Sequence, residues 1–189
     1  MTGKIQEEIT MNGRVEEIIK NILETRTIKD VFFAACGGSL VDLYPGYYFV
    51  NAESETLHPH WLTAKELVVS PSKFLNENAL VLICSHGGST NEAVAAARIA
   101  TERGAAVITM THNPDSVCAK EFNSIIYSWE PETDEKDKPQ GIVMYILNEV
   151  MRAKEPGYKK YDIILEGLEK ADTIVRKAVA RVQNRTWLF

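Results

Sequence analysis

The sequence predicts an α/β fold, a three-layer αβα sandwich built on a five-stranded parallel sheet with flanking helices. Short apolar segments alternate with segments of helical periodicity, and this alternation is typical of βαβ units. The segment 79–84 (ALVLIC) is apolar throughout, as expected for a strand covered on both faces. The length of 189 residues fits one such domain with helical extensions.

The first half of the chain supplies two expected strands. A helix comes first, predicted by four apolar residues spaced three and four apart: Val15, Ile18, Ile19 and Ile22. We expect a strand over 31–35, then a helix over 40–50 in which Pro45 lies early or causes a kink. A second strand over 57–61 contains Pro59, which weakens the pattern, and a short helical turn follows it at 64–67.

The middle of the chain repeats the strand–helix pattern more clearly. After the strand 79–84, an Ala-rich helix over 92–103 ends at Gly104, a typical helix stop. Further strands are expected over 105–110 and 124–128.

The remaining segments are helices and loops. Asp115 or Ser116 is expected to cap a short helix. A charged loop over 130–138 precedes a helix over 140–153, and Pro156-Gly157 separates that helix from a long one reaching about residue 181.

Two Gly/Ser-rich loops follow the strands that end at Cys36 and Cys84. In a flavodoxin-like strand order these two strands are neighbours, so their loops meet where such sheets bind ligands. The glycines allow tight turns and close approach of backbone N–H groups, and the hydroxyls and the following helix N-termini favour an anion. Neither loop contains Lys or Arg. One such loop alone is usually only a turn with a helix cap, but two together predict a phosphate site, formed by Gly37, Gly38, Ser39, Ser85, His86, Gly87, Gly88, Ser89 and Thr90.

The same loops, Cys-Gly-Gly-Ser at 36–39 and Ser-His-Gly-Gly-Ser-Thr-Asn-Glu at 85–92, resemble the phosphosugar loops of the SIS (sugar isomerase) family. The order and spacing of strands fit that family over about residues 30–155. The resemblance implies that four hydroxyl side chains contact the sugar phosphate: Ser39, Ser85, Ser89 and Thr90. It also makes Gln140 and Glu66 candidate sugar contacts. At Gly87 many family members have a second Ser, so one side-chain donor is lost here.

Within the family the sequence is most similar to deglycases of phosphorylated Amadori compounds, such as fructoselysine or glucoselysine 6-phosphate. The resemblance covers the first of the two SIS modules that these enzymes contain, and it implies a general acid and base, a Glu and a His, in the second. No position here matches them, so the catalytic residues stay unassigned. The resemblance divides the chain into an N-terminal helical extension (1–28), a phosphosugar-binding domain (29–155) and a C-terminal helix (156–189) that leads toward a second module.

The C-terminal helix itself carries a possible interface. Its apolar residues recur at steps of four and three, which predicts either packing on its own domain or a seam for another helix: Ile164, Leu168, Ala171, Val175, Ala178 and Val182. The final residues Trp187-Leu188-Phe189 are large and apolar, and a partner or a following domain would cover them. We therefore expect a homo-oligomer, a dimer in the simplest case.

Composition excludes several function classes. The net charge of −5, without a basic stripe, argues against nucleic-acid binding, and the apolar runs are too short to cross a membrane. Three cysteines without CxxC spacing predict no disulfide and a cytoplasmic location. His58 and His60 lack a third ligand at useful spacing, so no metal is expected, and the absence of a nucleotide-binding motif leaves no organic cofactor.

Three functions remain open. The first is the binding module of a deglycase that converts 6-phosphorylated Amadori products to hexose 6-phosphate and free amine. The second is a complete aldose–ketose phosphate isomerase, in which His86 or Glu66 would move the proton. The third is a non-catalytic sugar-phosphate sensor, disfavoured because the N-terminal extension is short and not basic. In the first and third functions, His86 lines the pocket or faces solvent.

Overall fold

The fold comes from a computed structural model, in which residues 11–183 are described. The first half of the chain contains α1 (Met11–Thr25), β1 (Asp30–Ala35), α2 (Gly38–Asp42), α3 (Tyr44–Glu53), β2 (His58–Thr63), α4 (Ala64–Val69) and β3 (Ala79–Cys84). The second half contains α5 (Asn91–Glu102), β4 (Ala106–Thr111), α6 (Val117–Glu121), β5 (Asn123–Ile126), the 3₁₀ turn η1 (Glu135–Asp137), α7 (Pro139–Lys154) and α8 (Tyr161–Gln183).

The five strands form one parallel sheet in the order β2-β1-β3-β4-β5. This order confirms the predicted flavodoxin-like topology. The last residue of β1, Ala35, pairs with Thr63 of β2 on one side and with Cys84 of β3 on the other. The carboxyl ends of these three strands therefore lie level at one edge of the sheet.

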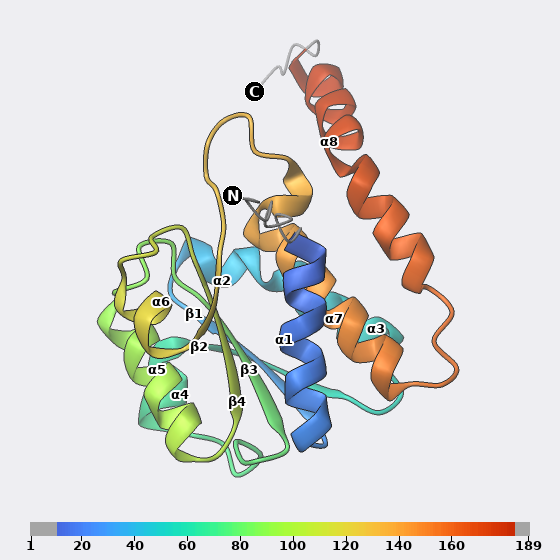
Figure 1. The fold of residues 1–189 in the computed structure, drawn as a ribbon. Helices are drawn as coiled ribbons and strands as arrows, with labels where there is room; N and C mark the ends of the chain where they lie inside the picture. The colour runs from blue at the N-terminus through green and yellow to red at the C-terminus, as the bar shows by residue number, and fades with distance from the viewer. Residues whose placement is uncertain (1–10, 184–189) are drawn as a thin grey trace, which may run out of the picture.

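Helices cover both faces of the sheet, so the molecule has the predicted three layers (Figure 1). Helices α1, α3 and α7 lie on one face and α4, α5 and α6 on the other. Successive side chains of a strand point to opposite faces, so Phe33 and Leu82 join the core under α1 and α7, while Phe32 and Ile83 join the core under α5. Two apolar cores thus bury the sheet from either side.

The two covering layers follow the predicted helical patterns. Val15, Ile19 and Ile22 of α1 are buried against the sheet. On the other face α5 presents a buried row of small side chains, Ala93, Ala96, Ala97 and Ala100.

The predicted helix over 40–50 was wrong in one respect, because the structure divides it at Leu43. Helix α2 ends at Asp42 and α3 begins at Tyr44, with Pro45 in its first turn. A proline has no N–H to donate and is tolerated only where a helix begins, so a new helix starts here.

The second strand runs over His58–Thr63 rather than 57–61 and lies at the edge of the sheet. An edge strand pairs on one side only, which is why Pro59 is tolerated there. The last strand ends at Ile126, two residues before the predicted end. Ser116 is the cap of α6, since its hydroxyl accepts a hydrogen bond from the Ala119 N–H.

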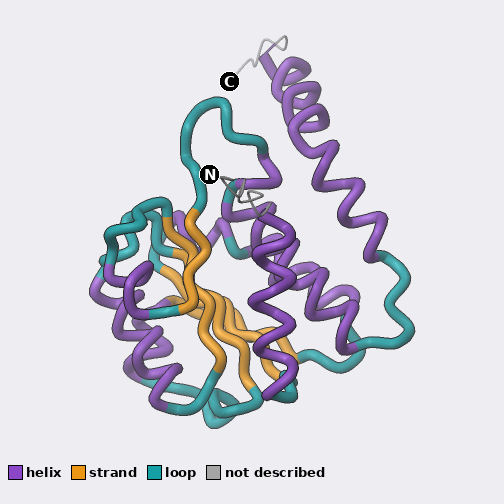
Figure 2. The backbone as a smooth tube through the Cα atoms, in the orientation of Figure 1, coloured by secondary structure: helices purple, strands orange, loops and turns teal. Residues whose placement is uncertain are grey.

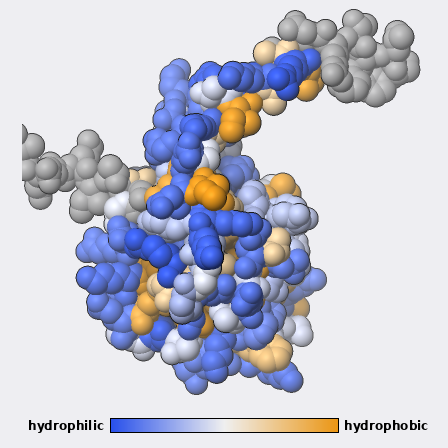
Figure 3. All heavy atoms as spheres, turned by 90° about the vertical axis from the view of Figure 1, so that its right-hand side faces the viewer, coloured by the Kyte–Doolittle hydropathy of each residue, from blue (hydrophilic) through white to orange (hydrophobic). Residues whose placement is uncertain are grey.

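Helix α8 is packed over its first half and exposed over its second. Ile164 and Leu168 pack against the core cluster that contains α7. Val175 and Val182 of the predicted seam are 40% and 53% exposed, on the part of α8 that projects from the body (Figure 3). The predicted seam therefore serves its own domain first and lies open beyond it, while Trp187–Phe189 lie outside the described residues.

No helix in the described range 11–183 is both long enough and apolar enough to span a bilayer.

Candidate functional site

The two predicted loops lie side by side at the carboxyl edge of the sheet. Because Ala35 and Cys84 are paired, the chain leaves β1 at Cys36 and β3 at Ser85 from neighbouring positions. In Figure 2 these connections are among the loops at the upper end of the sheet, which is the carboxyl end of the parallel strands. Strand order and register thus bring together residues that are about 50 positions apart in the sequence.

The first loop is open toward solvent. Gly37 has φ 56° and precedes the first residue of α2, and its carbonyl accepts a hydrogen bond of 3.1 Å from the Leu40 N–H. A Cβ atom built on Gly37 or Gly38 would meet nothing within 4 Å. Ser39 follows within the first turn of α2 and is partly buried. The space above this turn is available to a ligand.

The second loop is fixed by its own hydroxyls. Ser85 is buried, its hydroxyl donates a 3.2 Å hydrogen bond to the Thr90 hydroxyl, and its carbonyl accepts from the Gly88 N–H at 2.9 Å. Thr90 is the N-cap of α5 without a side-chain capping bond. The cap therefore leaves the first-turn N–H groups of α5 free to bind an anion, which the helix dipole also favours.

Gly88 joins this loop to α6. Its φ of 67° lies in the left-handed region, and an added Cβ would lie 2.1 Å from the Ser116 hydroxyl oxygen and 2.6 Å from that of Thr111. The Gly88 carbonyl accepts a hydrogen bond from the Cys118 N–H at 2.9 Å. Nearby, the Ser89 hydroxyl accepts from the Val117 N–H at 3.3 Å, which leaves its proton free to donate. Gly88 thus serves the loop's geometry, whereas Gly87 is exposed.

An aromatic group borders the second loop. The His86 ring lies 4.0 Å from the His112 ring and 5.0 Å from the Trp129 ring, measured between centroids. Its Nδ1 atom is 3.1 Å from the hydroxyl oxygen of Tyr127, which is buried. His86 remains exposed on its other side, so it lies on the rim of the site with a fixed ring position.

A carboxylate and an amide lie next to the first loop. The Gln140 Nε2 atom, in the first turn of α7, donates a 2.6 Å hydrogen bond to Oδ1 of Asp42, the last residue of α2. The Gln140 Oε1 atom is buried, and no donor among the described residues reaches it. The structure therefore places the predicted Gln140 against the helix that leaves the first loop.

Electrostatic effects connect these groups. Burial raises the pKa of Asp42, and His86 opposes that shift. Burial and then His112 lower the pKa of His86, while Asp42 opposes the shift. Burial raises the pKa of the Cys84 thiol to about 12, with Asp42 contributing in the same direction. His86 is therefore neutral at neutral pH, and Cys84 is a protonated thiol rather than a nucleophile.

Glu66 has a local role in the structure. Its carboxylate accepts hydrogen bonds from the Thr63 N–H at 2.7 Å and the Thr63 hydroxyl at 2.8 Å, which forms a capping box at the start of α4. These bonds lower the pKa of the fully exposed Glu66. The carboxylate thus faces its own helix terminus, and a sugar contact by Glu66 stays a prediction.

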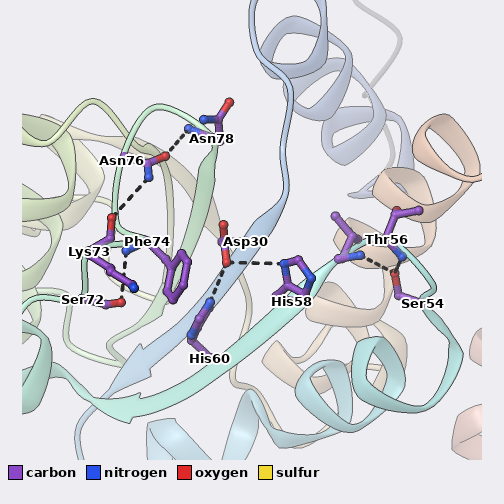
Figure 4. A network of polar contacts seen from close by, with 11 residues as sticks. Asp30, Ser54, Thr56, His58, His60, Ser72, Lys73, Phe74, Asn76 and Asn78 are labelled. Atoms are coloured by element: carbon purple, nitrogen blue, oxygen red, sulfur yellow. Dashed lines mark hydrogen bonds and ion pairs between the residues drawn. The ribbon is translucent and has the colours of Figure 1, made fainter.

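His58 and His60 lie at the opposite end of the sheet from the loops. Both approach Oδ1 of the nearly buried Asp30, with His58 Nδ1 at 3.8 Å and His60 Nε2 at 2.8 Å (Figure 4). The His60 ring also stacks on Phe32, with centroids 4.2 Å apart. This network ties the edge strand β2 to β1. Within residues 11–183, no group of three or more His, Cys, Asp or Glu side chains is arranged to hold a metal ion.

A cavity of about 610 Å³ lies elsewhere, between the end of α1, α6 and the amino ends of β4 and β5. Residues of the two loops do not line it. We place the candidate site at the loops because their hydroxyls and the N-termini of α2 and α5 lie together there.

Two residues of this site were missed in the sequence, Asp42 and Tyr127. Asp42 lies three positions after Ser39, a spacing that places two side chains on one face of a helix. That spacing was the available signal. Tyr127 gave none, because only the sheet topology brings it to His86.

Known protein families and solved structures resemble this chain in sequence and in fold. The SIS domain model matches residues 27–151. The chain is 32% identical over 180 residues to fructosamine deglycase FrlB of Bacillus subtilis strain 168, covering 95% of this chain and 54% of that protein. A crystal structure of a proposed phosphosugar isomerase from Salmonella typhimurium LT2 superposes with a TM-score of 0.85 at 32% identity, covering 97% of this chain and 56% of that one. A second, from Bacillus subtilis, gives a TM-score of 0.81 at 30% identity, covering 90% and 53%. The chain thus spans about half the length of these relatives.

Proposed function

The chain belongs to the SIS domain family, and from this membership we propose that it is the phosphosugar-binding module of a deglycase. The substrates would be 6-phosphorylated Amadori products such as fructoselysine or glucoselysine 6-phosphate. The products would be a hexose 6-phosphate and the free amine. The similarity to fructosamine deglycase FrlB over 95% of the chain supports this choice of reaction.

The observation that carries the proposal is the juxtaposition of the two loops. Ala35 of β1 pairs with Cys84 of β3, so the loops that contain Ser39 and Ser85 leave the sheet from neighbouring positions, and α5 begins directly after the second loop. These groups donate hydrogen bonds without bringing a positive charge, which explains how an acidic protein holds a phosphate. We assign the phosphate contacts to the hydroxyls and N–H groups of 37–39 and 85–90, with Gln140 toward the sugar.

The reaction needs a proton shift and a hydrolysis. In fructoselysine 6-phosphate, a proton leaves C1 and one is added at C2 through an enaminol, which yields an imine at C1. Water then adds to C1, the C–N bond breaks, and the amine leaves as the aldehyde of the hexose 6-phosphate forms. Holding the phosphate fixes the sugar carbons relative to the acid and base, and positioning of this kind contributes several kcal/mol to catalysis.

We further propose that the acid and base come from a second SIS module, toward which α8 leads, and that the working protein is a cytoplasmic homodimer. The chain's share of the deglycase length, 54%, is consistent with one of two modules. A complete isomerase is the second candidate, favoured by His86, a neutral imidazole on the rim of the site. Turnover of a ketose phosphate by residues 1–189 alone, lost in His86→Gln, would support the isomerase instead.

Binding of fructose 6-phosphate, measured by isothermal titration calorimetry, tests the phosphate assignment. Ser39→Ala should weaken binding by roughly tenfold or more, because a hydrogen bond to a charged group is worth about 1.5–3 kcal/mol. Ser70→Ala, on an exposed residue at the end of α4, is the matched control and should bind as the wild type does. Equal affinity in the wild type and Ser39→Ala would contradict the assignment.

A further inference from the structure

The Asp42–Gln140 pair is a polar feature of the site that phosphate binding does not use. Asp42 ends α2, three residues after Ser39, so the two side chains lie about one helical turn apart on the same face. Its carboxylate is held by Gln140 at 2.6 Å and is near enough to His86, Cys84 and Tyr127 to influence each of them electrostatically. The pair therefore lies at the same rim as the two loops.

Groups of opposite electrostatic character meet at this rim. The loops offer N–H groups, hydroxyls and a helix N-terminus, all of which favour an anion. Beside them lies the partly exposed carboxylate of Asp42, which the Gln140 amide holds in place.

A carboxylate beside anion-binding donors suits a ligand that carries both a phosphate and a positive charge. A phosphate placed against Asp42 would be repelled, whereas a protonated amine would be attracted and could donate to the carboxylate. Resting on the proposed function, we propose that Asp42, oriented by Gln140, binds the cationic nitrogen at C1 of a 6-phosphorylated amino sugar. Asp42 is thus the residue that distinguishes an aminated sugar phosphate from a plain one.

The test compares two ligands on the chain 1–189 by isothermal titration calorimetry. The first is 1-amino-1-deoxyfructose 6-phosphate, which carries the amine, and the second is fructose 6-phosphate, which carries a hydroxyl there. Asp42→Asn keeps the size of the side chain and its acceptor for Gln140 but removes the charge. We expect it to weaken binding of the amino sugar by roughly tenfold or more and to change fructose 6-phosphate binding by less than about twofold.

Asp115→Asn is the matched control, because Asp115 is exposed and forms an ion pair with the exposed Lys120. It should leave both affinities unchanged. An equal loss for both ligands in Asp42→Asn would make Asp42 a purely structural residue and overturn the inference. Wild-type protein that binds both ligands equally would overturn it too, while phosphosugar binding would stand. Binding of neither ligand would refute the proposed function itself, and the inference with it.

Discussion

Gly88 is the position at which the fold of the second loop is most sensitive to one added methyl group. Its φ of 67° is a conformation that side chains with a Cβ rarely adopt. The new Cβ would also lie 2.1 Å from the Ser116 oxygen and 2.5 Å from its Cβ, both in the cap of α6. Gly88→Ala therefore combines backbone strain with a collision that forces α6 or the loop to move.

The two effects can be estimated separately. Placing a non-glycine residue in the left-handed region costs about 1–2 kcal/mol, and overpacking a filled site costs about 1–3 kcal/mol. Together they predict a loss of about 2–5 kcal/mol in the free energy of unfolding. For a chain of this size that corresponds to a melting temperature lower by roughly 4–20 °C.

Thermal and urea unfolding followed by circular dichroism measure this difference. The neighbouring Gly87→Ala is the matched control, because Gly87 has no positive φ and its added Cβ would meet nothing within 4 Å. The control should lie within about 0.5 kcal/mol of the wild type. If Gly88→Ala proved as stable as Gly87→Ala, the reasoning about this loop would be refuted.

Two further predictions concern pH and assembly. The fold lowers the pKa of His86, so the unfolded chain binds more protons than the folded chain near and below pH 6.5, and the free energy of unfolding falls as pH falls through that window. The melting temperature of His86→Gln should therefore depend less on pH between pH 5 and 7.5 than that of the wild type. Identical pH profiles would contradict the shift. The exposed apolar stripe of α8 should join two copies of the chain, so Val179→Asp with Val182→Asp should reduce the mass measured by light scattering from dimer to monomer. Lys177→Asp on the same helix is the control, and an unchanged mass in the double variant would exclude this interface.

The sequence alone was enough to predict the sheet and the two neighbouring loops at its carboxyl edge. The strand 79–84 was predicted with its observed bounds because a strand buried on both faces is continuously apolar. The adjacency of the two loops followed from topology, since the carboxyl ends of neighbouring parallel strands share one edge. Each of these inferences rests on local patterns and on general rules of chain connection.

The tertiary structure decided what lies around those loops. Asp42 and Gln140 are 98 positions apart, and His86 and Tyr127 are 41 apart, so no local pattern pairs them. The break at Leu43, with Pro45 in the first turn of α3, leaves Asp42 at a helix end, but only the tertiary fold brings Gln140 to it. Periodicity and turn chemistry thus determined where the two loops lie. The packing of distant helices determined that Gln140 of α7 holds Asp42 of α2, because side-chain contacts depend on the arrangement of elements rather than on neighbours in the sequence.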